Sequence, residues 1–437
     1  MKYKKLLAQS LFWRVSGIVT SFILTLSIAR IFGPDLSAEL NLLIAGSALI
    51  ILIVNLNIDS AIIYFLAGNR FPLIPLINLV ATWCLIAMTG IFFFSYNINW
   101  TDLGHYSGKR LAIALFFYIS GLQVTNFSIA FFYGKQNFTS PGFFISLFNC
   151  IQAGVLIFLY LENENSSLLN TYLPVFFGAP FLQGFCLAVY FRIKYVRNYS
   201  LSFMPKEDVK KVFKMASVFF LANLLLFLMY RIDYWMLMKF DHSERKLELL
   251  GNYIQASKLG QSYLLFSSAI GSAIFAGISA SQQKEPIEAL CRTIRLLLAT
   301  GFFSYIIFLL IGRPGISFFY GSSFNHIYLC SLLIIPGIVS LMTVSVTANY
   351  LSGKGFIKYN LMGVILGLLI ILAGNYFFIP YQGIYASAVV SSIGYISYSA
   401  YMLIIFCNKT NCKWQFLVII RREDILFVKR LFNRGTS

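Results

Sequence analysis

The sequence contains few charged residues and very few acidic ones. Only 11% of its 437 residues are charged, and 16 are Asp or Glu against 34 Lys or Arg. Soluble domains carry about 25% charged residues, so this composition excludes an ordinary soluble domain. The hydrophobic share of 58% indicates a polytopic membrane protein, and we attribute the net charge of +18 to cationic loops rather than to nucleic-acid binding.

Motifs for metal, redox and nucleotide chemistry are also missing. The seven cysteines form no C-x-x-C pair, and the three histidines are isolated. A zinc site and a disulfide framework are therefore not expected. There is no P-loop, catalytic triad or paired-carboxylate motif, so we expect neither ATP-driven pumping by this chain, nor an enzyme, nor a cofactor.

Long apolar segments are abundant. They match the roughly 20 residues that a helix needs to cross a bilayer, and they lack the short alternating strands of a membrane barrel. The first segment is too long for a signal peptide and contains Arg14, so we expect it to be retained. Twelve segments are predicted as helices, near residues 9–32, 39–67, 72–95, 110–133, 141–161, 170–191, 212–239, 249–281, 287–312, 324–352, 357–379 and 383–407.

Basic residues are distributed unevenly between the two sides of the predicted membrane. With the N-terminus in the cytoplasm, 24 of the 34 Lys and Arg residues, Arg295 among them, fall in inner loops and the C-terminal tail. Only seven fall at outer ends. This asymmetry predicts that both termini are cytoplasmic.

The two halves of the chain share a short pattern. The turn after the fourth segment reads FFYGKQNF and that after the tenth reads YLSGKGF, and the longest inner loop, 192–211, separates six segments from six. Such a parallel repeat implies two lobes with a substrate site between them. We predict an N-terminal lobe over 1–200, a C-terminal lobe over 201–407 and a basic amphipathic tail over 408–437. Residues 413–435 are expected either to form a helix on anionic lipid or to be solvated.

Charged residues inside the predicted segments are the candidate site. An ionised side chain is costly in hydrocarbon, so each is expected to face a cavity or a partner. Matched depth predicts the ion pairs Arg14–Asp59 and Asp233–Lys258. Arg231 lies two residues from Asp233, on nearly the opposite side of the helix. It is therefore expected either to bind an anionic ligand or to bond to another helix. The candidate cavity residues are Arg14, Asp59, Arg231, Asp233, Lys258, Arg30, Tyr230 and Tyr234, with no metal ligand among them.

Seven short segments carry a resemblance to a known family. Their order and spacing along most of the chain are similar to those of the polysaccharide, or O-antigen, flippase branch of the MOP exporter superfamily, which includes the MATE drug exporters. The chain departs from that pattern at 36–39 and at 57–59, where the family often has Tyr-Gly and Asp-Leu-Gly. The segments are ARIFGPD at 29–35, NIDSAIIYFLA at 57–67, YRIDYWML at 230–237, GNYIQASKLGQ at 251–261, FFYGSSF at 318–324, YLSGKG at 350–355 and NYFFIPYQGIYASAVV at 375–390.

The resemblance implies a MATE-like, all-α fold of about twelve transmembrane helices in two six-helix lobes around a cationic central cavity. It also implies movement of an undecaprenyl-pyrophosphate-linked oligosaccharide, the O-antigen repeat unit, from the inner to the outer leaflet of a bacterial inner membrane. The expected partners are this glycan lipid, membrane lipids, and the polysaccharide polymerase and chain-length machinery, with no nucleic acid.

Two alternative functions stay open. One is a MATE-like drug/cation antiporter. It should favour an acidic cavity, whereas three basic residues stand against two acidic ones in the predicted spans. The other is an integral-membrane polysaccharide polymerase, which is an enzyme. The short outer loops argue against it, because an enzyme that acts on sugar donors at the outer face usually needs a larger soluble part.

Overall fold

The computed structural model describes residues 2–68, 70–97, 108–162, 168–196, 199–280, 287–419 and 421–424. These residues form α-helices joined by irregular segments, and none of them lies in a strand. Nine helices in this part of the chain are long and apolar enough to cross a membrane. Two of them, α1 (Lys2–Asn55) and α11 (Ile357–Thr410), are 54 residues long and each contains a non-helical glycine. The predicted class, an all-α polytopic membrane protein, is confirmed.

Gly33 and Gly383 divide the two longest helices where the sequence predicts a boundary between spans. Gly33 has φ 75° and ψ 179° and is followed by Pro34, whose missing N–H removes a helical hydrogen bond. Gly383 has φ 53° and ψ −130° and follows Pro380. Both conformations lie in regions that favour glycine, so each long helix is two spans joined by a kink.

The second predicted segment, 39–67, is not one continuous helix. Leu56 and Asn57 both adopt left-handed backbone conformations, with φ 47° and 55°, so α1 ends at Asn55 and α2 (Ile58–Ala67) begins after them. Left-handed residues cannot continue a right-handed helix. This break places Asp59 in the first turn of α2, where free backbone N–H groups favour a carboxylate.

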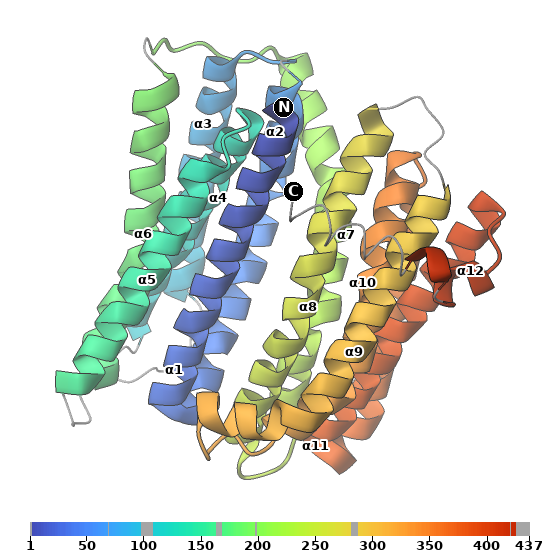
Figure 1. The fold of residues 1–437 in the computed structure, drawn as a ribbon. Helices are drawn as coiled ribbons and strands as arrows, with labels where there is room; N and C mark the ends of the chain where they lie inside the picture. The colour runs from blue at the N-terminus through green and yellow to red at the C-terminus, as the bar shows by residue number, and fades with distance from the viewer. Residues whose placement is uncertain are drawn as a thin grey trace, which may run out of the picture. The chain divides into compact units, whose positions relative to one another are not determined.

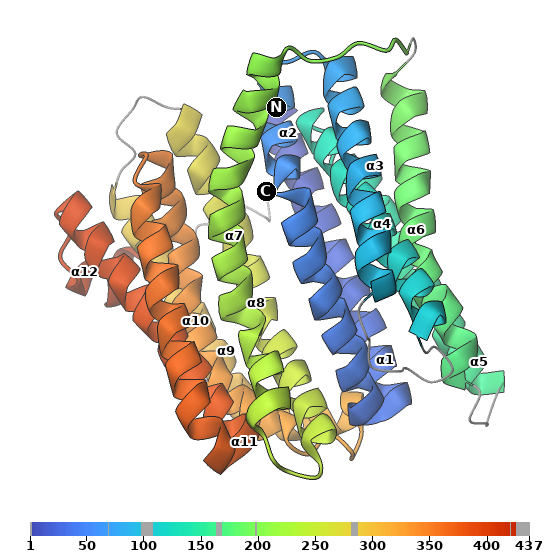
Figure 2. The same ribbon diagram turned by 180° about the vertical axis from the view of Figure 1, so that it is seen from behind.

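The chain divides into two compact units, each with one central helix. Unit 1 comprises Met1–Gly33 and Glu39–Leu224, and unit 2 comprises Pro34–Ala38 and Leu225–Ser437. In unit 1, α4 (Gly108–Gly134) packs along α6 (Leu168–Tyr195) and contacts α2, α3 (Leu73–Asn97) and α5 (Thr139–Glu162), as Figure 1 shows. In unit 2, α10 (Ile327–Gly353) packs against α8 (Lys246–Ala280), α9 (Ile287–Tyr320) and α11 (Figure 2). The division between the units falls within α7 (Lys206–Phe240).

The repeat predicted from the two Gly-Lys turns is present in the backbone. The turns after α4 and α10 place their one left-handed residue at the same position, Gln136 with φ 57° and Gly355 with φ 84°. They also make the same three N–H to C=O bonds, at residue pairs 135→131, 136→133 and 137→132 after α4 and 354→350, 355→352 and 356→351 after α10. The central helices of the two units therefore end in equivalent caps.

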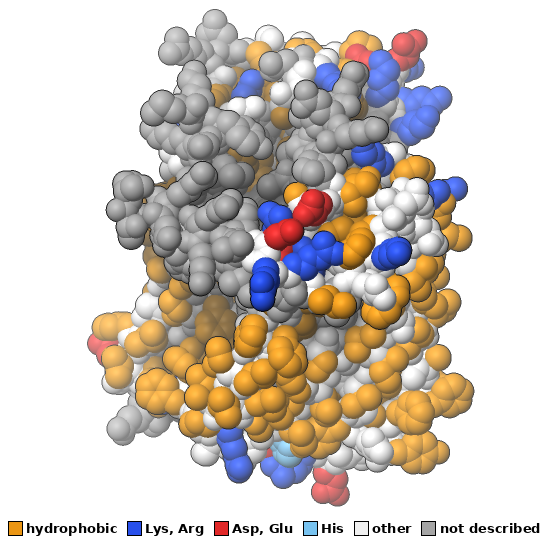
Figure 3. Space-filling model, turned by 45° about the vertical axis from the view of Figure 1, so that its right-hand side comes forward, with side chains coloured by type: hydrophobic (Ala, Val, Ile, Leu, Met, Phe, Trp, Pro, Cys, Tyr) orange, Lys and Arg blue, Asp and Glu red, His pale blue; other side chains and the backbone are white. Residues whose placement is uncertain are grey.

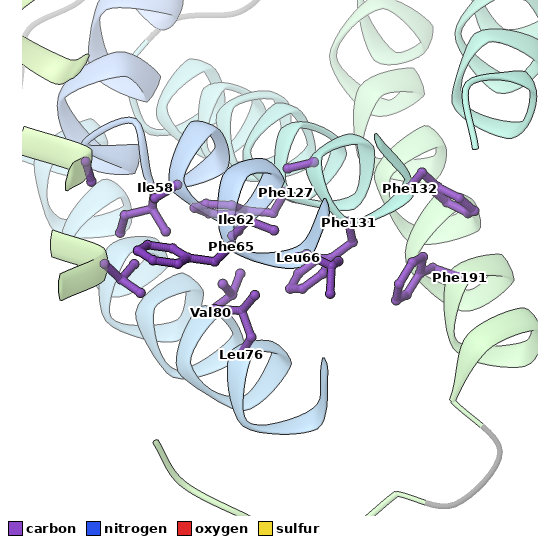
Figure 4. Close-up of a cluster of buried hydrophobic side chains, with 14 of the residues drawn as sticks. Ile58, Ile62, Phe65, Leu66, Leu76, Val80, Phe127, Phe131, Phe132 and Phe191 are labelled. Atoms are coloured by element: carbon purple, nitrogen blue, oxygen red, sulfur yellow. The ribbon is translucent and has the colours of Figure 1, made fainter. Parts of the chain in front are cut away.

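Unit 1 is held together by an aromatic core around α2 and α4. Phe65 of α2 packs with Leu76 of α3 and Phe131 of α4, and Phe132 of α4 meets Phe191 of α6 at a ring distance of 5.0 Å (Figure 4). Large buried rings contribute strongly to packing, because each removes about 150–250 Å² from solvent or lipid. This cluster fixes α2, and with it the backbone of Asp59, on the rest of unit 1.

The C-terminal tail differs from the expected surface helix. In its described part the four-residue helix α12 (Gln415–Val418) ends before a second helical stretch at 422–424, so the prediction of one helix from residue 413 is wrong there, and residues 425–437 lie outside the described part. Leu417 is 2% exposed and packs in a core with α9. Asp424 is fully buried and forms an ion pair with Arg295 of α9. Tertiary contacts with α9 therefore determine the path of the tail.

Candidate functional site

Arg231 and Asp233 lie two residues apart on α7 and bond to different groups, although both contact Tyr234. Asp233 is 1% exposed, whereas Arg231 is half-buried. A separation of two residues is about 200° of rotation around a helix, so the two side chains leave α7 in nearly opposite directions. Each therefore meets a different part of unit 2.

The Asp233 carboxylate accepts hydrogen bonds from three neutral donors. The Tyr253 hydroxyl of α8 and the Ser391 hydroxyl of α11 both donate to Oδ2, the latter at 3.3 Å, and the Tyr234 amide donates to Oδ1 at 3.0 Å. Hydrogen bonds of this kind compensate for the loss of water around a buried carboxylate. Asp233 thus joins α7, α8 and α11 inside unit 2.

The expected ion pair between Asp233 and Lys258 is not found among the described side chains. The hydrogen-bond donors to Asp233 are hydroxyl and amide groups, and Lys258 is not one of them. Burial has the largest effect on the Lys258 ammonium group, and repulsion from Arg231 is the next largest. The depth of the two residues along their helices predicted the wrong pairing, because depth does not reveal which side of α8 faces which side of α7.

Arg231 makes its hydrogen bonds on α7 and α8. One guanidinium nitrogen, Nη2, donates to Oε1 of Gln261 at 2.9 Å, and Nη1 donates to the Tyr234 hydroxyl. The guanidinium carbon also lies 5.1 Å from the centre of the Tyr234 ring, within range of a cation–π contact. Neither partner is a carboxylate. The expected bond from Arg231 to another helix is therefore present, and the Asp233 carboxylate, which does not bond to Arg231, is close enough for the two opposite charges to attract each other.

Gln261 links Arg231 to the helix that carries Lys258. It lies three residues after Lys258 on α8, which places both on one face of the helix. Its Nε2 donates to Ser257 at 3.1 Å while its Oε1 accepts from Arg231. Because both polar atoms of its amide are hydrogen-bonded, the Gln261 side chain holds the Arg231 guanidinium beside this part of α8. Arg231 and Lys258 are therefore two basic residues near each other in unit 2, here called the α7–α8 cation pair.

The other predicted site residues are more dispersed. Tyr230 is half-buried and meets the buried Tyr395 ring at 5.8 Å, and Asp59 is half-buried in α2 of unit 1. Arg30 is exposed near the kink in α1. The side chain of Arg14 lies outside the described part, so its expected ion pair with Asp59 stays a prediction.

Sequence reasoning missed two of the residues that hold Asp233. Tyr253 lies in the segment GNYIQASKLGQ, but nothing in its spacing distinguishes it from a packing residue. Ser391 lies 158 positions away from Asp233. No periodic signal links two residues at such a separation. A buried hydrogen bond from Gln255 to Ser37, at 3.1 Å, was also missed, although Gln255 lies on the polar face of the predicted helix.

Comparison with known proteins identifies the fold. No family model matches the chain, and no curated protein matches it. Among solved structures, it is similar to the lipid II flippase MurJ in an inward closed conformation, with 15% identity over 92% of this chain and 87% of that one, and a TM-score of 0.65.

Two further neighbours are transporters of the MOP superfamily. One is a MOP superfamily transporter from Pyrococcus furiosus, with 12% identity over 93% of this chain and 96% of that one, and a TM-score of 0.64. The other is an inward-facing multidrug resistance MATE transporter, with 14% identity over 90% of this chain and 94% of that one, and a TM-score of 0.67. The chain therefore has the fold of MOP superfamily transporters.

Proposed function

We propose that this protein is a flippase that moves an undecaprenyl-pyrophosphate-linked oligosaccharide, an O-antigen repeat unit, from the inner to the outer leaflet of a bacterial inner membrane. A charged pyrophosphate and a hydrophilic glycan cannot cross hydrocarbon unaided. The fold shared with MurJ and MATE transporters supports a translocation pathway, and the sequence resemblance supports the glycan-lipid class. The two six-helix lobes, divided near residue 200, and the cytoplasmic position of both termini belong to this proposal.

The α7–α8 cation pair carries the proposal. Arg231 of α7 bonds to Gln261 of α8, three residues from Lys258, so two basic side chains lie within electrostatic range of each other in unit 2. Like charges that lie close together in a medium of low polarity are less unfavourable when an anionic group binds between them. A pyrophosphate, with two linked anionic groups, offers one group to each cation. The planar guanidinium of Arg231 also suits paired phosphate oxygens.

Side chains next to Arg231 are suited to orienting the headgroup and to contacting the sugar. Gln261 and Tyr234 orient the Arg231 guanidinium, so little conformational freedom is lost when the headgroup binds. Tyr230 presents an aromatic ring, and a ring of this kind packs well against the apolar face of a sugar. The polyprenyl chain stays in the bilayer while the headgroup crosses through alternating access of the two lobes.

The test is a polysaccharide-display assay in cells that express variants at equal membrane levels. Arg231→Ala should abolish display of polymer, and Arg231→Lys should retain part of it because the charge remains without the paired geometry. Lys258→Ala should reduce display. Lys239→Ala, on the exposed end of the same helix, is the matched control and should behave as the wild type. Wild-type display by Arg231→Ala would refute the assigned role of Arg231.

A MATE-like drug/cation antiporter is the second candidate, because solved structures of such exporters share the fold. The two functions predict opposite responses to positive charge. A cation exporter should tolerate or gain from Arg231→Ala, since removal of a positive charge favours a cationic substrate, and it should expel a fluorescent organic cation. A flippase should lose polymer display and accumulate the lipid-linked unit in the inner leaflet. Surface display of a single repeat unit in a deletion strain would instead indicate the polymerase.

A further inference from the structure

A groove lies between the end of α11 and the segment that leads into α12. It has a volume of about 590 Å³ and is lined mainly by apolar groups, among them Leu403, Ile404, Cys407, Trp414 and Leu417. Ligand-binding clefts in proteins typically enclose about 300–1,000 Å³. This space, called the α11–α12 groove below, is thus large enough for part of a lipid molecule.

The outer wall of the groove is held in place by a buried ion pair. Arg295 of α9 binds Asp424 through Nε and Nη2, both at 2.7 Å, and its Nη1 donates to the carbonyl oxygen of Phe416 at 2.5 Å. Leu417 enters the core formed by α9. A segment with these contacts cannot fold into the groove or leave it without breaking the ion pair, so the groove is a built feature of unit 2.

An apolar stripe on α11 leads into the groove. Ile393, Ile396 and Ile404 are exposed by 49%, 44% and 59%, and their spacing of three and eight residues places them on one face of the helix. In a membrane protein this face is covered by acyl chains. Figure 3 shows the side of unit 2 that carries α9 and α11, where Lys and Arg side chains, with Asp or Glu side chains among them, lie above a broad hydrophobic surface. Ile404, at the end of the stripe, lines the groove together with Trp414.

The chain around the groove is basic where it is accessible. Lys409, Lys413 and Arg422 are exposed, and Arg421 is half-buried. Of the two acidic residues in the described tail, Asp424 is buried against Arg295, which leaves Glu423 as the exposed one. Trp414 is 66% exposed, and tryptophan is enriched at the level of lipid headgroups. The surface therefore combines an interfacial aromatic ring with an excess of positive charge.

From these observations we infer that the α11–α12 groove binds a phospholipid with an anionic headgroup, its acyl chain along Ile404 and Leu403 and its phosphate at Lys413. Basic residues close to a membrane surface attract anionic lipids. The inference requires only that the chain lies in a membrane, and it is independent of what the protein transports. It assigns the tail a role in recognising the lipid around unit 2.

Quenching of Trp414 fluorescence by brominated lipid tests this inference. The full-length protein is reconstituted in vesicles of phosphatidylcholine that contain an equal molar fraction of brominated phosphatidylglycerol or brominated phosphatidylcholine. The protein has five tryptophans, so Trp414→Phe supplies the background to subtract. We expect brominated phosphatidylglycerol to quench the Trp414 signal about twofold more than brominated phosphatidylcholine, because the cations enrich the anionic lipid.

Charge variants separate a specific site from ordinary surrounding lipid. Lys413→Glu should remove the difference between the two brominated lipids, whereas Lys210→Glu, at an exposed lysine of α7, should leave it unchanged. Equal quenching by both lipids in the wild type would overturn the inference, since Trp414 would then lie in lipid without headgroup selection. Absence of quenching by either lipid would also overturn it and would indicate that protein covers the groove. Because no step measures transport, failure here does not bear on the proposed flippase function.

Discussion

Arg295 of α9 and Asp424 of the C-terminal tail form a paired ion bridge in which each side chain is only 1% exposed. Two hydrogen bonds of 2.7 Å join the guanidinium to the carboxylate, and the Arg421 amide donates to the same carboxylate at 2.9 Å. Arg292 adds a second cation, with its Nε 3.4 Å from Asp424. A tail with a buried, doubly paired carboxylate is a structural part of unit 2.

Removing one member of this ion pair should release the tail. Asp424→Asn leaves the Arg295 charge buried without its carboxylate, and such changes cost about 3–5 kcal/mol. We expect trypsin to cleave after Lys413 much faster in this variant than in the wild type. The apolar double variant Arg295→Met with Asp424→Leu should recover much of the protection. Equal cleavage rates in Asp424→Asn and wild type would show that the bridge does not hold the tail.

The attachment of the tail should also depend on pH. Hydrogen bonding to Arg295 lowers the pKa of Asp424 below its usual value near 3.9. A carboxylate with a lowered pKa in the folded state stabilises that state fully above the unfolded pKa, and the contribution is lost as pH falls through the folded value. The tail should therefore stay docked from neutral pH to about pH 4 and detach only in stronger acid.

Pepsin, which is active in acid, provides the measurement for this pH dependence. Cleavage within the tail of the wild type should rise as pH falls below about 4, the unfolded carboxyl pKa. Asp424→Asn should show no comparable step, because it lacks the titrating group. Loss of protection already at pH 6 would contradict the assignment to Asp424.

Two thiols should report the docked tail by cross-linking. The sulfur atoms of Cys291 on α9 and Cys412 before α12 lie 3.2 Å apart, and both cysteines are free. Mild oxidation of the membrane-embedded protein should therefore link them, and peptide mass spectrometry after digestion should detect the pair. Cys412→Ser is the direct control. Asp424→Asn should lower the yield if the ion bridge keeps the sulfurs together, and an unchanged yield would mean that other contacts suffice.

The Asp233 network should behave as a coupled unit. Tyr253→Phe removes one hydrogen bond from a buried carboxylate and should destabilise the protein by about 1–3 kcal/mol. Asp233→Asn alone should also destabilise it, since an amide cannot accept at both oxygen positions. The double variant should lose less free energy of unfolding than the sum of the two single losses, as expected for residues in direct contact. Thermal unfolding in detergent gives the three values, and strict additivity would argue against the bond.

Part of the candidate site was predictable and part was not. Hydropathy placed Arg231, Asp233 and Lys258 inside spans, and helical rotation separated Arg231 from Asp233. The donors to Asp233 were not predictable, because Ser391 belongs to another span and its hydroxyl carries no distinctive signal. Arg295 was assigned to an inner loop by its charge, yet it is buried, because a carboxylate 129 residues away neutralises it.

The sequence by itself determined the membrane-spanning character, the approximate ends of the spans and the repeat of the Gly-Lys turns. These properties depend on local quantities, namely the length of apolar runs and the backbone preferences of a few residues. Tertiary structure alone decided that Asp233 bonds to Tyr253, that Lys258 lies near Arg231 and that the tail docks on α9. Pairing between helices depends on which faces meet in space, and a single sequence gives the faces of each helix but not their neighbours.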